Sequence, residues 1–416
     1  MNVLFVTLVG INSIEDRGIY QDLLRKFRNK GHAVTIVSPV ERRNGIATNF
    51  HKKEEISLLQ VRTLNVTKTS IVEKGIGTLA LEYQYLAAIR KYLANTKFDL
   101  VMYSTPPITF GKVIAYIKKR DNARSYLLLK DIFPQNAVDL GMMRRDGVLH
   151  SFFRRKEKQL YRVSDYIGCM SPANVEYVLK HNPELLPSRV EVCPNSIELV
   201  EEITEKNSSL RAHYNIPEEA TLYIYGGNLG KPQGLDFLME VLERNNNIAD
   251  RFFIVIGSGT EKQRLSEWFQ SRKLSNALML DGLPKNEYDQ LVRSCDVGLI
   301  FLDRRFTIPN YPSRLLSYLE YKMPVLMATD VHTDIGPIAE ENGFGLWCEN
   351  GNIEAFNKML DTLCGDKELR MQMGERGYRY LMENYTVERS YEVIMKKNPA
   401  LKLVRIIDSK FNVELD

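Results

Sequence analysis

The sequence predicts an α/β fold in which two Rossmann-like domains face each other across a cleft. Short apolar runs that are typical of buried strands alternate with helical patterns from residue 2 to residue 192, and the same alternation restarts at residue 221. A chain of 416 residues also exceeds the length that a single hydrophobic core usually supports. In open α/β sheets, ligands bind beyond the carboxyl ends of the strands, so the loops that follow strands are the places to search for a site.

The first half begins with a strand–helix–strand unit. Residues 2–9 predict a strand, residues 19–30 a helix that Gly31 closes, and residues 33–38 a second strand. Residues 41–58 are polar and charged, which indicates a long loop or a weak hairpin. Further strands are expected at 59–64, 99–103, 125–129, 166–170 and 190–192, with helices at 79–93 and after Ser104-Thr-Pro-Pro107.

The second half repeats this organisation. Strands are expected at 221–225, 252–256, 277–280, 297–301, 325–327 and 345–347, with helical patterns between most of them. We place the junction where the charge changes sign, which predicts a first domain over 1–195 and a second over 196–385. The C-terminal segment over 386–416 forms either a final strand or a crossing back to the first domain.

Composition favours a globular cytoplasmic protein. Apolar content of 44% and charged content of 26% are ordinary for this class, and no apolar run approaches the roughly 18 residues of a membrane span. The first residues lack a basic region and a cleavage site, so we expect them to form a buried strand and not a signal peptide. The five cysteines are widely spaced, which favours reduced, mostly buried thiols over a disulfide framework or a zinc site.

The two halves carry opposite net charge. Residues 1–195 contain 30 Lys and Arg against 18 Asp and Glu, a net charge of +12, whereas residues 196–416 contain 26 against 34, a net charge of −8. A basic half suggests that the first domain meets an anionic partner or surface. Random variation of the surface is the alternative explanation.

A glycine-rich loop, Gly226 to Gly234, follows the strand at 221–225 and precedes a helical pattern at 235–242. Free backbone N–H groups and the helix dipole make such a loop an anion site, and Gly227 and Gly230 would let the backbone approach a phosphate closely. Asn228 adds amide donors and Lys231 adds a positive charge. The loop has neither the P-loop pattern nor the dinucleotide pattern Gly-x-Gly-x-x-Gly, so ATPase and dehydrogenase functions lose support. An ordinary turn that needs its glycines for positive φ is the alternative.

Three further loops could contact the same ligand. Gly257, Ser258 and Gly259 follow the strand at 252–256 and open a helix, so they offer more backbone donors to a diphosphate. Gly282 and Leu283 follow the strand at 277–280, where backbone groups could bind a planar base or simply form a turn. At the start of the helix near residue 313, Ser313 offers a hydroxyl, Arg314 a guanidinium, and Ser317 a second hydroxyl one turn on. The backbone N–H groups that follow Ser313, including that of Leu315, are expected to be free for a phosphate.

Asp131 follows the strand at 125–129, where its side chain should face the cleft. A carboxylate at this point could accept a proton from an acceptor hydroxyl or position that hydroxyl. A capping Asp is the alternative on residue type alone. The six histidines show no metal-ligand spacing and the chain has no Asp-x-Asp sequence, so we expect no metal site and no cofactor.

Residues 142–162 contain seven basic and two acidic residues with apolar side chains at helical spacing. Such a pattern could lay a basic face against anionic lipid, and the arginines that would do so are Arg144, Arg145, Arg154 and Arg155. For the aromatic residues of this stretch, a core-packed helix with a solvated basic face is the favoured interpretation.

Six short motifs lie in a specific order over most of the chain: Ser104-Thr-Pro-Pro107, Asp131-Ile-Phe-Pro134 with Asp139-Leu-Gly141, Cys193-Pro-Asn-Ser-Ile197, Gly226 to Gly234, Gly257-Ser-Gly259 and Pro312-Ser-Arg-Leu315. Together they resemble the family four retaining glycosyltransferases, which have the GT-B fold. The resemblance is strongest to the bacterial branch that builds capsule and O-antigen repeat units and contains N-acetyl-L-fucosamine transferases.

The chain departs from the family pattern at two points. In the family, an Arg and a Lys of the glycine loop hold the diphosphate, but here Asn228 and Gln233 occupy those positions. The Glu-x7-Glu pair of the family falls on Pro309 and Ser317, so both carboxylates are absent. Lys231, Arg314 and Ser317 are the candidates for substituting.

The resemblance implies that the second domain binds a nucleotide-sugar donor, expected to be a UDP-sugar, and the first domain binds the acceptor. The enzyme would transfer a hexosyl or N-acetylaminosugar group to a polyprenyl-diphosphate-linked sugar at the inner face of the plasma membrane, with Asp131 and Lys231 as catalytic residues. It would lie peripherally on an anionic membrane surface and bind no nucleic acid. A nucleotide-sugar 2-epimerase of the same fold, or a non-catalytic nucleotide-binding partner, is the alternative.

Overall fold

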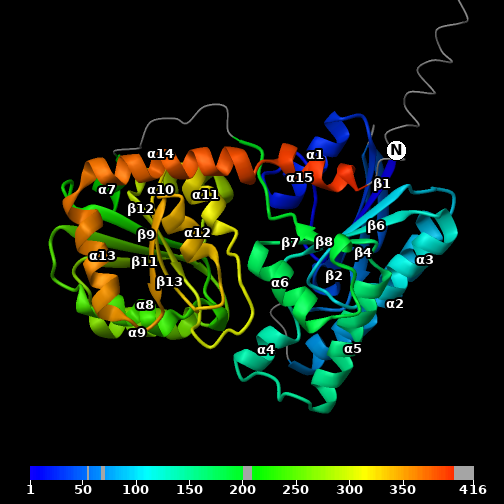
Figure 1. The fold of residues 1–416 in the computed structure, drawn as a ribbon, viewed down its shortest axis with the longest axis horizontal. Coiled ribbons are helices and arrows are strands. Elements are labelled where there is room, and N and C mark those ends of the chain that lie inside the picture. The colour runs from blue at the N-terminus through cyan, green and yellow to red at the C-terminus, as the bar shows by residue number, and fades with distance from the viewer. Residues whose placement is uncertain (54–55, 67–70, 200–208, 398–416) are drawn as a thin grey trace, which may run out of the picture. The chain divides into compact units, whose positions relative to one another are not determined.

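The computed structural model of the chain describes residues 1–53, 56–66, 71–199 and 209–397. The chain divides into two units, each built on its own sheet (Figure 1). The first unit comprises Met1–Glu198 and Val387–Asp416, and the second comprises Leu199–Thr386.

The sheet of the first unit has the strand order β3-β4-β2-β1-β5-β6-β7-β8. Neighbouring strands are parallel, except that β3 pairs antiparallel with β4. The strands are β1 (Asn2–Val6), β2 (Ala33–Glu41), β3 (Asn49–Lys53), β4 (Ile56–Thr63), β5 (Leu100–Ser104), β6 (Arg124–Leu129), β7 (Tyr166–Cys169) and β8 (Val190–Val192). The helices are α1 (Ile19–Asn29), η1 (Arg42–Asn44), α2 (Ile71–Tyr92), α3 (Gly111–Asp121), α4 (Gln135–Asp139), α5 (Val148–Val163), α6 (Pro172–His181), η2 (Pro187–Arg189) and α15 (Val387–Lys396).

Most predicted strands of this unit appear within one to three residues of their expected bounds. The polar stretch 41–58 contains β3, whose pairing with β4 confirms the hairpin and not the loop. The helix expected after Pro107 begins only at Gly111. Residues 3–6 of β1 are completely buried, because elements cover both faces of a central parallel strand.

The C-terminal helix α15 belongs to the first unit. Its residues Val387, Ile394 and Met395 join the same buried cluster as Phe27 of α1. The ring of Tyr391 contacts the edge of Phe27, with centroids 4.9 Å apart. The chain therefore leaves the first unit once and returns to it, and the last described turns complete its core. The final residues, 398–416, lie outside the described part.

The sheet of the second unit is entirely parallel, with the order β11-β10-β9-β12-β13-β14. The strands are β9 (Thr221–Asn228), β10 (Arg251–Ser258), β11 (Ala277–Leu280), β12 (Val297–Phe301), β13 (Val325–Thr329) and β14 (Gly345–Glu349). The helices are α7 (Ser209–His213), η3 (Lys231–Gln233), α8 (Leu235–Arg244), α9 (Lys262–Arg272), α10 (Lys285–Ser294), α11 (Arg314–Glu320), α12 (Ile335–Glu341), α13 (Ile353–Gly365) and α14 (Lys367–Asn384). Every residue of β12 and β13 is buried, as expected for strands covered on both faces.

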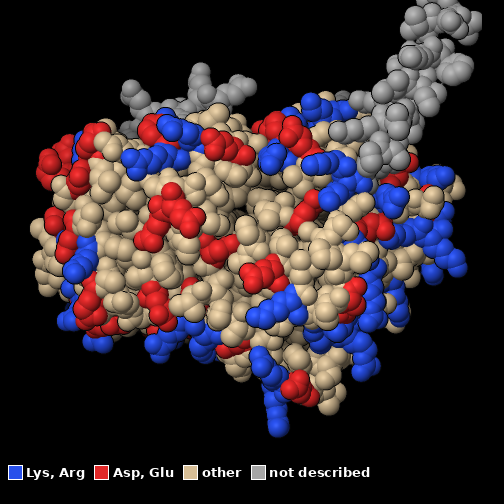
Figure 2. All heavy atoms as spheres, in the orientation of Figure 1, with Lys and Arg blue, Asp and Glu red and all other residues tan. Residues whose placement is uncertain are grey.

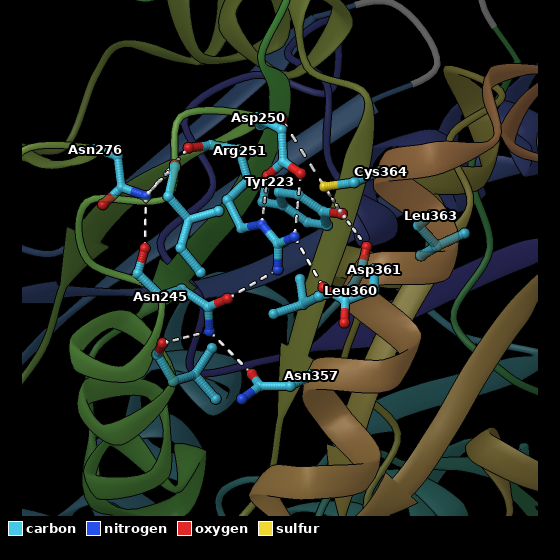
Figure 3. A network of polar contacts seen from close by, with 12 residues as sticks. Tyr223, Asn245, Asp250, Arg251, Asn276, Asn357, Leu360, Asp361, Leu363 and Cys364 are labelled. Carbon is cyan, nitrogen blue, oxygen red and sulfur yellow. Dashed lines mark hydrogen bonds and ion pairs between the residues drawn. The ribbon is translucent and has the colours of Figure 1, made fainter.

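A polar network fastens the amino end of β10 to α13 (Figure 3). The guanidinium of Arg251, which is 5% exposed, donates to Asn245 Oδ1 at 2.9 Å and to Asp361 Oδ1 at 2.8 Å. Asn245 in turn donates to Asn357 Oδ1 at 2.9 Å. This network lies at the amino ends of the strands, opposite to the glycine loops, so it has a structural role.

None of the helices in the described part of the chain combines the length and the hydropathy that a membrane span requires.

Replacing Arg251 with Leu should lower the free energy of unfolding by about 2 kcal/mol, because it removes charge-assisted hydrogen bonds and leaves the buried Asn245 Oδ1 without its donor, whereas Asp250 and Asp361 are exposed to water. Urea denaturation measures this change. The matched control is Arg264→Leu, whose half-exposed guanidinium pairs with Asp236 and Glu261 and should change stability by only about 0.5 kcal/mol. Equal effects of the two substitutions would contradict a structural role for the network.

Candidate functional site

Two glycine segments lie against each other at the carboxyl ends of β9 and β10. The strand register pairs Gly227 with Gly257 and Asn228 with Ser258. Beyond the strands, the Leu229 N–H donates to the Ser258 carbonyl oxygen at 2.8 Å. The structure thus brings together the first two predicted loops. It also corrects the first one, since β9 extends through Asn228 and does not end at residue 225.

Glycine is required where these segments meet. A Cβ atom on Gly257 would overlap the carbonyl oxygen of Gly227, and a Cβ atom on Gly259 would overlap that of Leu229. Gly257 also has a φ of 156°, which side chains rarely tolerate. The two backbones can therefore approach each other only because no side chain stands between them, and Gly227 and Asn228 remain exposed above the sheet.

Arg314, at the start of α11, extends its guanidinium toward this glycine surface. Its Cζ lies 4.4 Å from the centroid of the Tyr225 ring, and its Nη2 donates to Gln233 Oε1 at 2.5 Å. A Cβ atom on Gly227 would lie 3.6 Å from Arg314 Cζ, so the guanidinium borders the end of β9. Its Nη1 is buried and has no hydrogen-bond partner among the described residues. One charged donor is thus left for a ligand.

Tyrosines complete the surroundings of this arginine. The Tyr288 hydroxyl lies on Gly226, where a Cβ atom would overlap it, and burial raises the pKa of Tyr288 to about 12. The Tyr318 hydroxyl accepts from the Gly226 N–H at 3.2 Å. Sequence analysis missed Tyr225, Tyr288 and Tyr318, because a tyrosine in a strand or an amphipathic helix has the pattern of a core residue.

Lys231 begins the short helix η3, directly after the glycine segment of β9. Its side chain is exposed, and the described part of the chain provides it with no hydrogen bond or ion pair. The neighbouring Gly230 is buried and lies beside the amide of Asn228, because a Cβ atom on it would be 3.1 Å from Asn228 Nδ2. An exposed amide and an exposed ammonium group therefore stand next to the two glycine segments.

The other predicted donor contacts are less uniform. Gly282 is exposed and Leu283 half-buried at the end of β11, next to β10 in the sheet. Ser313 is exposed at the start of α11 and Ser317 is half-buried. Leu315 differs from the prediction, because its side chain is completely buried and its N–H donates to the Pro312 carbonyl oxygen at 3.2 Å.

In the first unit, Asp131 follows β6 and is held by its neighbours. Asn136 Nδ2 donates to both carboxylate oxygens, at 2.8 and 2.9 Å. The N–H groups of Lys130 and Asp131 both donate to Thr105 Oγ1, which fixes the backbone. Burial raises the pKa of Asp131 to about 6, although the hydrogen bond from Asn136 lowers it in part. Such a carboxylate is ionised at neutral pH and can still accept a proton.

Lys130 is a further unusual group that sequence analysis did not single out. Burial lowers its pKa to about 8, and its ammonium group donates to the Cys193 carbonyl oxygen at 3.2 Å. The sequence did offer a signal for Lys130, because Lys130 and Asp131 are two adjacent ionisable residues directly after a buried strand. The five cysteines are free and four of them are buried, which agrees with the expected mostly buried positions. Over the residues that the structure describes, no group of His, Cys, Asp and Glu could hold a metal ion.

The predicted basic surface is present with one exception. Arg144, Arg145 and Arg155 are exposed. Arg154 is instead turned toward the protein, where it pairs with the buried Glu157 and donates to Asn182 Oδ1 at 2.8 Å. On the face shown in Figure 2, Lys and Arg gather over the first unit where α2 and α3 lie. Of the aromatic residues of α5, Tyr161 is buried in the core as favoured, whereas Phe152 and Phe153 are half-buried and Phe153 packs on Phe133.

An exposed apolar tip lies among these arginines. Met142, Val148 and Leu149 are 64%, 88% and 65% exposed, in the loop before α5 and in its first turn. Single exposed apolar side chains are normal, but three of them close together in the chain form an apolar patch, which is the more informative observation. We call Met142, Val148, Leu149 and the three exposed arginines the basic–apolar tip.

Residues 206–380 match the family model described as "Glycosyl transferases group 1". A relative from Pseudomonas aeruginosa, "Probable glycosyltransferase WbjE", is 21% identical over 330 residues, which cover 78% of this chain and 80% of the relative. The "O-antigen biosynthesis glycosyltransferase WclY" of Escherichia coli is 24% identical over 204 residues, covering 48% of this chain and 53% of the relative.

Among solved structures, Anabaena HepE in complex with UDP and glucose superposes with a TM-score of 0.68 at 13% identity, covering 96% of this chain and 100% of HepE. This likeness and the two parallel sheets confirm the GT-B fold class with its two Rossmann-like units. Together with the match over the second unit, it confirms the resemblance that the motifs suggested. Residues 206–380, which lie in the second unit, are therefore similar to the group 1 glycosyltransferases.

Proposed function

We propose that this glycosyltransferase moves a sugar, with retention of anomeric configuration, from a UDP-sugar to a polyprenyl-diphosphate-linked acceptor. The product would serve capsule or O-antigen synthesis. The relative WclY supports this role through its name, and HepE supports the nucleotide because it was solved with UDP and glucose. One observation carries the proposal: the buried Nη1 of Arg314 has no hydrogen-bond partner among residues 1–53, 56–66, 71–199 and 209–397, and it lies beside two abutting glycine segments.

The donor diphosphate would lie over Gly227 and Gly257. There, backbone N–H groups, the guanidinium of Arg314 and the ammonium group of Lys231 would meet its oxygens. Bond cleavage to the sugar leaves negative charge on the β-phosphate, and fixed donors aimed at that charge lower the barrier without reorganising. Arg314 is already held by Tyr225 and Gln233, so it requires little ordering when the ligand binds.

Asp131 would act on the acceptor. An ionised carboxylate that Asn136 holds through both oxygens can orient an acceptor hydroxyl and accept its proton as the new glycosidic bond forms. The basic–apolar tip would bring the first unit to the surface in which the polyprenyl chain is embedded. The arginines would meet anionic headgroups while Val148 and Leu149 enter the interface.

Lys231→Ala should lower kcat by about 10²–10³-fold, because it removes one cation from the charge that develops in the transition state. The fold should be retained, since Lys231 is exposed and makes no contact that stability requires. Steady-state transfer assays with thermal melting measure both quantities. Lys358→Ala, an exposed lysine on α13, is the matched control. Activity of Lys231→Ala near that of this control would show that the phosphate assignment is wrong.

The pH dependence should report Asp131. Because the carboxylate must be ionised to accept a proton, kcat/KM should be full well above pH 6 and fall as pH drops through about 6. Asn136→Ala removes a hydrogen bond that stabilises the ionised form, so the acid limb should move to higher pH. A pH–rate profile measures the shift, with Asp139→Asn as the control. If the acid limb of Asn136→Ala stays at the pH of the unmodified enzyme, the titration belongs to a group other than Asp131.

Vesicle flotation tests the basic–apolar tip. Replacing Arg144, Arg145 and Arg155 with Ser should weaken binding to phosphatidylserine-containing vesicles by about 100-fold, since each basic residue contributes about 1 kcal/mol. High salt should reproduce part of that loss. The control is Arg124→Ser, an exposed arginine at the start of β6 that is not part of the tip. If the triple variant and the control float equally well, the tip does not contact lipid.

Incubation with UDP-sugar alone separates the two alternatives. Only a 2-epimerase would change the sugar without an acceptor, whereas a non-catalytic partner would bind UDP and transfer nothing. We expect that UDP-sugar alone leaves the sugar unchanged. We expect transfer once a polyprenyl-diphosphate-linked sugar is added.

A further inference from the structure

The first unit contains a small polar cavity between α4, α5 and α6, which has no role in the transfer as described above. Its volume is about 100 Å3. A water molecule takes about 30 Å3 in the liquid, so the cavity holds a group of three or four heavy atoms and not a sugar ring. Its polar walls come from Gln135, His150, Arg154, Glu157, Tyr177 and His181.

The hydrogen bonds of the two histidines fix which nitrogen carries the proton. His181 Nδ1 lies 2.9 Å from the Tyr177 carbonyl oxygen, which can only accept, so Nδ1 carries the hydrogen and Nε2 of the neutral ring is an acceptor. His150 Nδ1 accepts from the Asp146 N–H at 3.2 Å, so its Nε2 carries the hydrogen and is a donor. The cavity therefore has one imidazole of each polarity.

The outer atoms of these side chains are accessible, since His181 is exposed and His150 and Tyr177 are half-buried. His150 Nε2, His181 Nε2 and the Tyr177 hydroxyl make no hydrogen bond within the part of the chain that the structure describes. The rings are nevertheless held in place, because Tyr177 stacks on His181 with centroids 4.0 Å apart. The wall thus presents a fixed donor, a fixed acceptor and a hydroxyl group, all open to a ligand.

The charges in the wall are already balanced. Arg154 pairs with Glu157 and donates to the His181 carbonyl oxygen at 2.7 Å and to Asn182 Oδ1 at 2.8 Å. Glu157 is 3% exposed; burial raises its pKa, while Arg154 and the Tyr161 hydroxyl lower it. An anion would meet this carboxylate and find the guanidinium engaged. The wall therefore suits a neutral group that has both a donor and an acceptor.

The position of the cavity connects it with the acceptor. Ile132 and Pro134, which follow Asp131 in the chain, form part of its wall, and consecutive Cα atoms are about 3.8 Å apart. His150 directly follows Val148 and Leu149 of the basic–apolar tip. A lipid-linked sugar that presents a hydroxyl to Asp131 would therefore have its neighbouring substituent within reach of the cavity.

We propose that this cavity receives the acetamido group of the acceptor sugar, which makes the acceptor an N-acetylated aminosugar. The His150 Nε2–H and the Tyr177 hydroxyl donate to the acetamido oxygen, and His181 Nε2 accepts from its N–H. Ile132 and Val178 contact the methyl group. The four heavy atoms of an acetamido group match the volume, and its adjacent donor and acceptor match the two imidazoles. The proposal rests on the proposed function for the existence of a sugar acceptor.

The test titrates the full chain with methyl N-acetyl-β-glucosaminide and, in parallel, with methyl β-glucoside, which differs only in having a hydroxyl in place of the acetamido group. NMR signals of the imidazole rings report binding, and His150→Phe and His181→Phe assign two of the six histidines. The N-acetylated glycoside should shift both rings and saturate at about 1–10 mM, the weak affinity that one small group supplies. The glucoside should shift neither. Equal shifts with both glycosides, or no shift with either, overturns the proposal.

Tyr177→Phe and His181→Phe should each weaken binding of the N-acetylated glycoside by about five- to tenfold, because each removes one hydrogen bond. Tyr177→Phe keeps the stacked ring, so it also covers the case in which His181→Phe does not fold. His213→Phe, an exposed histidine of the second unit, is the control. Unchanged affinity in Tyr177→Phe and His181→Phe contradicts the assignment.

A transfer assay separates this proposal from the proposed function. Transfer that is equally efficient to lipid-linked acceptors with and without the acetamido group overturns the cavity assignment and leaves the transferase function intact. Selective glycoside binding without any transfer supports the cavity and contradicts the proposed function.

Discussion

The close approach of two strand ends in the second unit is the constraint on which the candidate donor site depends. At the carboxyl edge of the sheet, Gly257 lies against the carbonyl oxygen of Gly227, and Gly259 lies against that of Leu229. No side chain larger than hydrogen fits at either contact. The result is an exposed strip of backbone that a phosphate can approach closely. The surrounding sequence places charge at the margin of this strip and keeps side chains off its centre.

The arginine at that margin is unusual because its environment holds it without neutralising it. Arg314 stacks on Tyr225 and donates to Gln233, both of which are uncharged, and its buried Nη1 has no partner in the part of the chain that the structure describes. A structural arginine is generally paired with carboxylates. Arg251, at the amino end of β10 in the same sheet, pairs with Asp250 and Asp361 in this way (Figure 3). The contrast between these two arginines distinguishes a position prepared for an anion from one that fastens a helix to a strand.

The architecture was predictable from the sequence, because strands buried on both faces leave short apolar runs that glycine and proline interrupt. The end of β9 was predicted too early, at residue 225, since a strand that continues through Gly226 and Gly227 loses its apolar pattern. The partner of Arg314 was not predictable, because Gln233 lies 81 residues away in the chain. Arg154 was grouped with Arg155, although adjacent residues of a helix point in different directions, and only one of them faces solvent. The cavity that His150 and His181 line was not predictable from the sequence, because the two histidines lie on different helices, α5 and α6, and only the fold brings them together.

The structure of the complex with UDP tests the central claim most directly. The account predicts a diphosphate oxygen about 2.8–2.9 Å from Arg314 Nη1, the usual length of a charge-assisted hydrogen bond, over the backbone of Gly227 and Gly257. A nucleotide bound elsewhere on the second unit, with Nη1 still unpaired, would contradict it.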